Sequence, residues 1–525
     1  MEKSNVDLLG VLKSKLKGKS VEIIDDQLGF ATFVTKKESH RDVVKALLDV
    51  DEKTAVSAIT GADLGDDIDV LFHLRTSTGL ATIRTQVPKK NPQIKTINDL
   101  LPGAAFHELE VSDLLGVNFE GNKREGHLVL PDTWPEGVYP LRKDVKASEV
   151  KMNPAPTCDT PSCGIEKQVK IVIGPQHPAL LEPEKFSVTV DGETVTAVEP
   201  RIGYVHRGVE KASESRTYLQ DVYLVERICG ICNSCHAGAF VESVEKILKT
   251  EVPQRAKYIR TIILELNRLH SHLLTLGHAC LEVGYETLFQ YFWRDREPIM
   301  DLTEILTGNR VISSSMTVGG VRRDLKDTDI PKIKSVLADL KKKAPFYRQV
   351  YEDEPTLRMR MKNVGVLSRE DALKLCVVGP VARGSGVDID VRKDDPYEAY
   401  GEIPFNVITR PDGDTWARMN VRMDEVEESI KIIEYAIDNM PTGAYRVKVP
   451  RVVVAGETVN RVEAPRGELF YYLKSNGTAY PERVKVRTPT FSNIPAFLTT
   501  AIGETIADVP PNFVSLDPCF SCTDR

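Results

Sequence analysis

Two short cysteine pairs, far apart in the sequence, constrain the fold of this chain more than any other feature. Each pair has the spacing Cys-x-x-Cys, at Cys229 and Cys232 and again at Cys519 and Cys522, which lets one tight loop direct both sulfurs to a single metal. Cys232 and Cys519 lie 519 − 232 = 287 positions apart, whereas the pairs of a local zinc ribbon lie within roughly 15–20 residues of each other. If the four thiols act together, the whole domain between them must fold before the pairs can meet.

Composition and charge narrow the class of protein. The 525 residues include 69 Lys and Arg and 76 Asp and Glu, a net charge of −7, which gives no basic footprint for nucleic acid. We expect no signal peptide, because the N-terminal segment lacks a long apolar stretch and a twin-arginine pair. We expect no membrane span either, because nowhere do about 18 uncharged apolar residues run together. Nine cysteines in a chain expected in the cytoplasm favour metal or redox chemistry over a disulfide framework.

The length predicts two or more domains, and the patterns predict an α+β fold. Residues 1–145 mix short apolar runs with a helical pattern and are expected to form an α+β domain. Prolines among small polar residues predict a linker at 146–168, in which Cys158 and Cys163 are interpreted as ordinary surface thiols. Residues 169–525 are expected to form a mainly helical domain with small peripheral sheets. Its predicted elements include a hairpin at Asp191-Gly192, a helix from Pro253 to near Gly277, and a hairpin at Asn476-Gly477.

The segments around the two cysteine pairs, RICGICNSCH and DPCFSC, resemble the two nickel-binding motifs of nickel-iron hydrogenase large subunits. The resemblance implies that Cys229 and Cys519 are terminal nickel ligands. It implies that Cys232 and Cys522 bridge nickel to an iron that carries cyanide and carbon monoxide. Four thiolates form a soft, electron-rich ligand set that suits nickel, zinc or iron–sulfur chemistry. The implied activity is reversible heterolytic formation and cleavage of molecular hydrogen, with Cys519 accepting the proton.

The resemblance also gives roles to two residues near the cysteines. Glu182 aligns with a glutamate that takes the proton from a terminal thiolate and passes it toward solvent. Without the family, a glutamate between prolines would be interpreted as a solvated loop residue. His236 matches a histidine that hydrogen-bonds a bridging sulfur, whereas a lone histidine beside a helix is usually packed or solvated. Cys235, outside the motif, is interpreted as a packing residue.

Further matches lie between and beside the two motifs. Arg466, in the segment EAPRG, resembles an arginine that overhangs the metals, where a fixed cation could polarise a small ligand. Asp517 would join it above the metals, or else cap the loop backbone. Pro489 and Thr490 match a turn that hydrogen-bonds an iron-bound cyanide.

One position departs from the family pattern. Glu210, in the motif RGVE, matches a glutamate that binds magnesium in many hydrogenases, together with a histidine three places after the last cysteine. Here that place is Arg525. Because a guanidinium cannot ligate a cation, we predict that Arg525 replaces both the magnesium and its histidine by pairing with Glu210 or the nearby chain.

Longer segments indicate a branch of the family. GPQHPALLEPEKF, ELNRLHSHLLTLG and GPVARGSGVDID resemble motifs shared by membrane-bound group 4 hydrogenases and the quinone-module subunit of respiratory complex I. In the first domain, FHELEVSDLLGVNFEGN and YPLRKD resemble the small complex I subunit that docks beside that module. The fusion is similar to hydrogenases of the formate hydrogenlyase type, which implies hydrogen evolution.

The same resemblance implies the partners. The chain has no spare set of cysteines for an iron–sulfur cluster, so the proximal cluster would belong to a small hydrogenase subunit, with a ferredoxin-like iron–sulfur subunit beyond it. Ion-translocating subunits would hold the chain at the cytoplasmic side of the membrane. A formate dehydrogenase and a maturation protease are further expected partners. Two alternatives stay open: a nickel-free, complex I-like quinone-site or docking subunit, and a zinc-stabilised scaffold.

Overall fold

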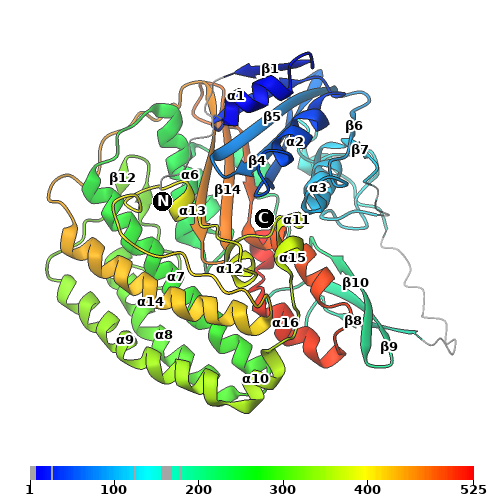
Figure 1. The fold of residues 1–525 in the computed structure, drawn as a ribbon. Coiled ribbons are helices and arrows are strands. Elements are labelled where there is room, and N and C mark those ends of the chain that lie inside the picture. The colour runs from blue at the N-terminus through cyan, green and yellow to red at the C-terminus, as the bar shows by residue number, and fades with distance from the viewer. Residues whose placement is uncertain (1–7, 25–27, 123, 125, 155–167, 178–179) are drawn as a thin grey trace.

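The computed structural model describes residues 8–24, 28–122, 124, 126–154, 168–177 and 180–525. A twisted sheet with helices lies at one end of the molecule, a stack of long helices at the other, and a second sheet between them (Figure 1). This arrangement confirms the predicted α+β class. Residues 155–167 of the predicted linker, with Cys158 and Cys163, lie outside the described residues.

The N-terminal part is built on a five-stranded sheet with the order β1-β2-β5-β4-β3. β2 and β5 pair in parallel, and the other neighbours are antiparallel. Helix α3 packs against β3. The elements are α1 (Leu8–Lys15), β1 (Val21–Ile24), β2 (Ala31–Thr35), α2 (His40–Leu48), β3 (Ala55–Asp63), β4 (Asp67–Thr76), β5 (Gly79–Pro88), β6 (Gln93–Lys95), α3 (Ala105–Leu115) and β7 (Asn118–Glu120).

Side chains of this sheet are divided between two cores because successive residues of a strand point to opposite faces. Ile59 and Phe72 belong to the N-terminal core. Ala58 and Leu71, their neighbours in sequence, instead pack in one cluster with Phe470 and Tyr472 of the second sheet. The N-terminal sheet therefore shares a buried interface with the second sheet.

The second sheet, β13-β14-β15, is antiparallel and lies between the N-terminal sheet and the helices (Figure 1). Its β14–β15 turn is the predicted hairpin at Asn476-Gly477, and the β9–β10 turn is the one predicted at Asp191-Gly192; both predictions are confirmed. Strands β8, β9 and β10 form a separate sheet, and β11 and β12 form another. The strands after residue 167 are β8 (Gln168–Ile173), β9 (Lys185–Asp191), β10 (Thr194–Arg201), β11 (Met316–Thr317), β12 (Gly320–Val321), β13 (Gly456–Ala464), β14 (Gly467–Ser475) and β15 (Pro481–Arg487).

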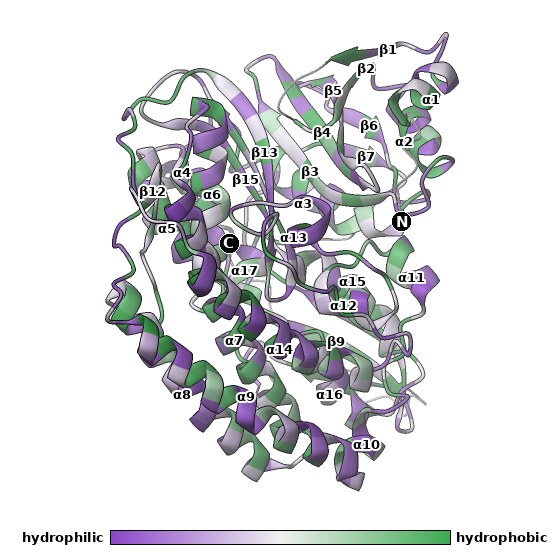
Figure 2. Ribbon diagram, turned by 60° about the vertical axis from the view of Figure 1, so that its left-hand side comes forward, coloured by the Kyte–Doolittle hydropathy of each residue, from purple (hydrophilic) through white to green (hydrophobic). Residues whose placement is uncertain are grey.

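Four long helices, α7 (Gln254–Glu282), α8 (Glu286–Thr307), α9 (Ile330–Asp353) and α14 (Thr415–Asn439), form the far end. Hydrophilic and hydrophobic residues alternate along the outer α8 and α9 (Figure 2), as expected for helices with one face against a core. The predicted end of α7 at Gly277 is wrong. A Cβ there would meet Phe292 and Trp293 of α8 at 3.1 Å, so this glycine permits close helix packing and does not end the helix.

Buried ion pairs cross-link the helices to the second sheet. Arg383 of α12 (Gly379–Gly384) contacts Glu425 of α14 and Glu463 of β13, both at 2.8 Å. Among the described residues, we find no helix with the length and apolar character that a bilayer crossing requires. The shorter helices are α4 (Val209–Ser213), α5 (Tyr218–Glu226), α6 (Asn233–Leu248), α10 (Pro355–Met361), α11 (Arg369–Lys374), α12 (Gly379–Gly384), α13 (Val391–Asp394), α15 (Pro489–Thr500), α16 (Val509–Ser515) and α17 (Phe520–Asp524).

Candidate metal centre

The two cysteine pairs meet at one buried point in the centre of the molecule. The Sγ atoms of Cys229 and Cys519 lie 3.3 Å apart, and those of Cys232 and Cys522 also lie 3.3 Å apart. The sulfurs of Cys229, Cys232 and Cys522 all lie within 4.8 Å of one another. All four side chains are at most 3% exposed. The first cysteine loop, residues 229–232, thus places its sulfurs against those of the second cysteine loop, residues 519–522.

Helix ends position these sulfurs. Cys229 lies in the turn after α5, and Cys232 and Cys519 are the residues immediately before α6 and α17. The Ile231 N–H donates to Cys229 Sγ over 3.2 Å. The Cys519 N–H donates to Thr490 Oγ1 over 3.1 Å, which ties the second loop to the first turn of α15, where Pro489 is the first residue. Thr490 therefore contacts the cysteine loop directly.

The thiols influence one another's protonation. The hydrogen bond from Cys232, followed by those from Cys519 and Cys522, lowers the pKa of Cys229 well below its usual value. The contact with Cys229 raises the pKa of Cys232 and of Cys519. Without a metal, ionisation of Cys229 thus disfavours ionisation of the neighbouring thiols. A soft cation bound among them would stabilise all four as thiolates. The donor set fits a thiolate-bound metal.

His236 joins the second loop to the second sheet. Its Nε2 lies 3.6 Å from Cys522 Sγ, and its Nδ1 lies 2.7 Å from the hydroxyl of Tyr471 on β14. Burial lowers the pKa of His236 to about 4, so the ring is neutral at neutral pH. If Tyr471 donates to Nδ1, the proton of the ring lies on Nε2 and faces the sulfur. Sequence reasoning missed Tyr471, because GELFYYL signals only a strand.

Arg466 and Asp517 form a buried pair. The Arg466 Nε donates to the Asp517 carbonyl oxygen and an NH2 group to Asp517 Oδ1, both over 2.7 Å. A third bond, 3.3 Å long, reaches Ser271 Oγ. Burial by itself would lower the pKa of Arg466, but Asp517 and the cysteines raise it overall. Asp517 has φ +56°, a left-handed conformation that aspartate tolerates better than most residues. Asp517 thus holds the Arg466 cation in a fixed position near the sulfurs.

Glu182 contacts the loop between the last two cysteines. Its carboxylate accepts the Ser521 N–H over 2.7 Å and also the Ser521 hydroxyl. The side chain is partly exposed, so it lies between the buried sulfurs and the surface. Two residues on, Glu184 is buried, and burial together with the neighbouring Asp524 raises its pKa. Sequence reasoning singled out neither Ser521 nor the buried pair of carboxyl groups formed by Glu184 and Asp524.

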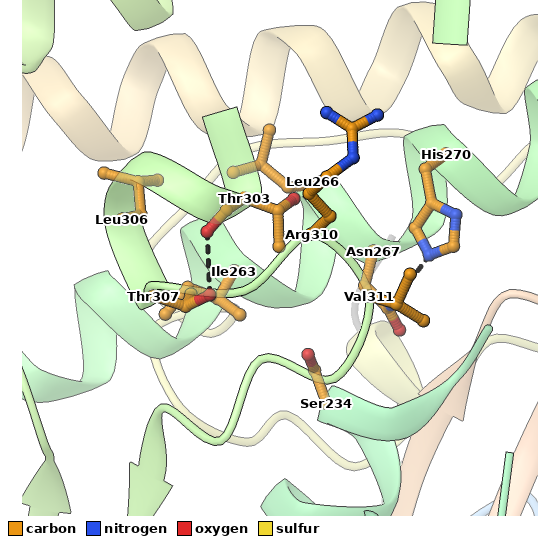
Figure 3. Close-up of a pocket in the computed structure, with 10 residues that line it drawn as sticks. All are labelled: Ser234, Ile263, Leu266, Asn267, His270, Thr303, Leu306, Thr307, Arg310 and Val311. Atoms are coloured by element: carbon orange, nitrogen blue, oxygen red, sulfur yellow. Dashed lines mark hydrogen bonds between the residues drawn. The ribbon is translucent and has the colours of Figure 1, made fainter. Parts of the chain in front are cut away.

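A small cavity of about 10 Å³ lies behind the first loop, and Figure 3 shows Asn267 and His270 side by side in its wall. Both contact the Ile231 carbonyl oxygen, Asn267 Nδ2 at 2.6 Å and His270 Nε2 at 3.0 Å. An NH2 group of Arg296 lies 3.2 Å from His270 Nδ1. Nε2 also lies 3.0 Å from Asn267 Nδ2, the contact that Figure 3 draws as a dashed line. Asn267, His270 and Arg296 thus form one polar group against the loop that carries Cys229 and Cys232.

Glu210 lies among cations. Arg483 contacts its Oε2 at 2.8 Å, and Lys485 and the Arg525 Nε each lie 3.5 Å from its Oε1. Burial alone would raise the pKa of Glu210, but Lys485 and Arg483 lower it overall. The position that the family resemblance connects with magnesium is thus surrounded by positive side chains. Arg525 also contacts Glu110 of α3.

Comparison with known protein families gives three matches along the chain. Residues 33–151 match the respiratory-chain NADH dehydrogenase 30 Kd subunit, and residues 282–455 and 451–525 match the 49 Kd subunit. Residues 207–280, which contain the first cysteine pair, match the nickel-dependent hydrogenases. The order of the matches agrees with the predicted fusion.

Individual relatives cover most of the chain. It is 36% identical to formate hydrogenlyase subunit 5 of Escherichia coli (strain K12), over 85% of this chain and 79% of that protein. It is 39% identical to membrane-bound hydrogenase subunit alpha of Pyrococcus furiosus, over 69% of this chain and 88% of the relative. The NADH-quinone oxidoreductase C/D protein of Phocaeicola vulgatus is 36% identical, over 86% of this chain and 91% of that protein.

A solved structure shares the fold. A chain of the membrane-bound sulfane sulfur reductase, an archaeal respiratory membrane complex, superimposes with a TM-score of 0.66 and 33% identity, covering 68% of this chain and 99% of that one. The relatives, the family matches and this structure agree with the resemblance carried by the sequence motifs. The chain belongs to the family of group 4 hydrogenase large subunits that are related to complex I.

Proposed function

We propose that the chain binds a nickel-iron centre and is the catalytic subunit of a hydrogenase. One observation carries this proposal: two buried loops 290 residues apart bring their thiols together, with 3.3 Å between the sulfurs of Cys229 and Cys519 and 3.3 Å between those of Cys232 and Cys522. A subunit that only docks, or that serves a quinone, has no chemical need for paired thiols at both ends of its domain. Cys229, Cys232, Cys519 and Cys522 would hold the metals.

The bound centre, with cyanide and carbon monoxide on its iron, would supply the heterolytic formation and cleavage of molecular hydrogen. The chain's own residues would handle the proton. Glu182, held on Ser521 at the edge of the second loop, would exchange a proton with Cys519 and pass it outward. The His236 Nε2–H would stabilise the negative sulfur of Cys522 by a hydrogen bond.

Other residues would fix the surroundings of the centre. Arg466, oriented by its ion pair with Asp517, would present a cation beside the sulfurs without exposing them to water. Thr490 holds the Cys519 backbone through the 3.1 Å bond to its Oγ1, and the turn of Pro489 and Thr490 would donate to a ligand of the iron. Burial of the four thiols keeps solvent from the reacting atoms.

We propose that no magnesium binds at Glu210. The carboxylate already has three cationic neighbours, and a divalent cation would be repelled by them. Arg525 would take the place of both the metal and its histidine ligand. Metal analysis that found magnesium bound at Glu210 would overturn this part of the proposal.

We further propose the organisation and partners of the chain. Residues 1–145 would be a docking domain, 146–168 a linker and 169–525 the catalytic domain. By analogy with relatives named as parts of membrane-bound hydrogenase and formate hydrogenlyase, the chain would sit on the cytoplasmic side of the membrane and evolve hydrogen. A small subunit with the proximal iron–sulfur cluster, a ferredoxin-like subunit, ion-translocating subunits, a formate dehydrogenase and a maturation protease would complete the system.

A nickel-free quinone-site subunit is the second candidate, because relatives of similar identity are NADH-quinone oxidoreductase subunits. Two measurements on the purified complex separate the candidates: elemental analysis for metals, and an assay of isotope exchange between deuterium gas and the protons of water. Nickel and iron with isotope exchange support the hydrogenase. Their absence supports the quinone-type subunit, and zinc without exchange supports a structural scaffold.

A further inference from the structure

The N-terminal domain reaches the second cysteine loop through one buried carboxylate. Glu110, on α3, is fully buried. Its Oε2 lies 2.5 Å from Lys485 Nζ on β15, and its Oε1 contacts an NH2 group of Arg525. The contact crosses from the N-terminal part of the chain to the residue that follows α17, three positions after Cys522.

The backbone of Arg525 is held from the opposite side. Its carbonyl oxygen accepts the N–H groups of Arg207 and Val209 over 3.1 and 3.3 Å. Its guanidinium extends over the ring of Phe491, 5.4 Å from the centroid, toward Glu110. The end of the helix that carries Cys522 is thus fixed at two places, one of them by a side chain of the N-terminal domain.

Charge balance explains why a carboxylate is needed there. Glu110 and Glu210 together face three cations: Arg483, Lys485 and Arg525. Without Glu110, Glu210 would be the single carboxylate of this set. Because buried like charges repel strongly and a buried charge needs a partner, the guanidinium of Arg525 would then keep only the longer, 3.5 Å contact with Glu210, which it shares with Arg483 and Lys485.

We propose that Glu110 is a positioning residue for the second cysteine loop, so that the N-terminal domain is part of the metal centre's framework and not only a docking module. That the loop binds metal rests on the proposed function. The positioning itself depends only on the contacts of Glu110 and can be tested without metal.

Glu108 provides a matched control. It lies on the same helix and is also fully buried, but it bonds only within the N-terminal domain, to Thr96, Ile97 and Asn122. Glu110→Gln and Glu108→Gln therefore remove the same charge from the same helix. A general loosening of the domain would affect both variants, whereas loss of positioning would affect the first alone.

The test is backbone hydrogen exchange of the metal-free full-length chain, read by mass spectrometry. Glu110→Gln should speed exchange in residues 519–525 by about tenfold, the factor expected for one lost hydrogen bond to a charged group. Glu108→Gln should leave these residues unchanged. Equal effects of both variants, or no effect of Glu110→Gln, would overturn the proposal.

Two further measurements keep the test decisive. If Glu110→Gln does not accumulate, Glu110→Asp, which keeps the charge but shortens the side chain, must show the same selective increase, and its absence would overturn the proposal. In metal-loaded protein, Glu110→Gln should shift the infrared bands of the iron ligands while Glu108→Gln leaves them in place. A wild-type chain without nickel would refute the proposed function and leave the exchange result to decide the role of Glu110.

Discussion

Removing Arg466 should cost more than the hydrogen bonds that it makes. The side chain forms two 2.7 Å bonds to Asp517 and one 3.3 Å bond to Ser271, and both partners of the ion pair are at most 4% exposed. Arg466→Leu leaves the Asp517 carboxylate buried without its cation. Breaking a buried pair from one side costs about 3–5 kcal/mol.

The double variant separates the pair from its surroundings. Asp517→Asn keeps an acceptor at a position with φ +56° but leaves the Arg466 guanidinium buried without its anion, again at a cost of about 3–5 kcal/mol. In Arg466→Leu/Asp517→Asn no charge is left unpaired, so the combined cost should fall short of the sum by about 2 kcal/mol or more.

Urea unfolding of the metal-free chain, followed by circular dichroism, gives the four free energies of this cycle. Measuring the metal-free form keeps metal affinity out of the comparison. Ser271→Ala, which removes only the weakest partner, is the control and should cost about 1 kcal/mol or less. Additive costs, within about 0.5 kcal/mol, would refute the view that the two residues act as a coupled buried pair.

Three further predictions concern the proton path, the histidine beside Cys522 and the response to pH. Glu182→Gln should lower isotope exchange by roughly 10²–10⁴-fold with the nickel content unchanged, and Ser521→Ala should lower it less; full activity of Glu182→Gln would remove Glu182 from the proton path. Tyr471→Phe, which removes the partner of His236 Nδ1, should shift the infrared bands of the iron ligands, and unshifted bands would contradict this role. Burial, helped by Arg84 and Lys485, lowers the pKa of His73 to about 3, so its contribution to stability is complete above about pH 6.5 and is lost by up to about 1.4 kcal/mol per pH unit as the pH falls toward 3. His73→Gln should flatten the pH dependence of urea unfolding between pH 7 and 5, and an unchanged slope would contradict the assignment.

Local patterns predicted the parts of the structure that depend on neighbours in sequence. The turn dipeptides Asp191-Gly192 and Asn476-Gly477 placed two hairpins correctly, because the backbone geometry of a tight turn depends on the residues in it. Gly277 misled the prediction of a helix end, since its role depends on Phe292 and Trp293 of a neighbouring helix. A local rule for glycine cannot anticipate such a contact.

The residues of the site also differ in how far local sequence predicts them. The Cys-x-x-Cys spacing marked the four cysteines that the fold brings together, because two thiols of one short loop need that spacing to reach a single metal. Tyr471, His270 and Glu110 carry no such signal. Each lies in an ordinary strand or helix pattern, and its importance arises from contacts such as the 2.7 Å approach of Tyr471 to His236, across 235 positions of sequence.

X-ray absorption at the nickel edge of the purified complex tests the central claim most directly. The account predicts a shell of sulfur neighbours around nickel with iron beside it, and loss of nickel in both Cys229→Ser and Cys519→Ser. Nickel bound only through nitrogen and oxygen, or full retention of nickel when cysteines of both loops are replaced, would contradict it.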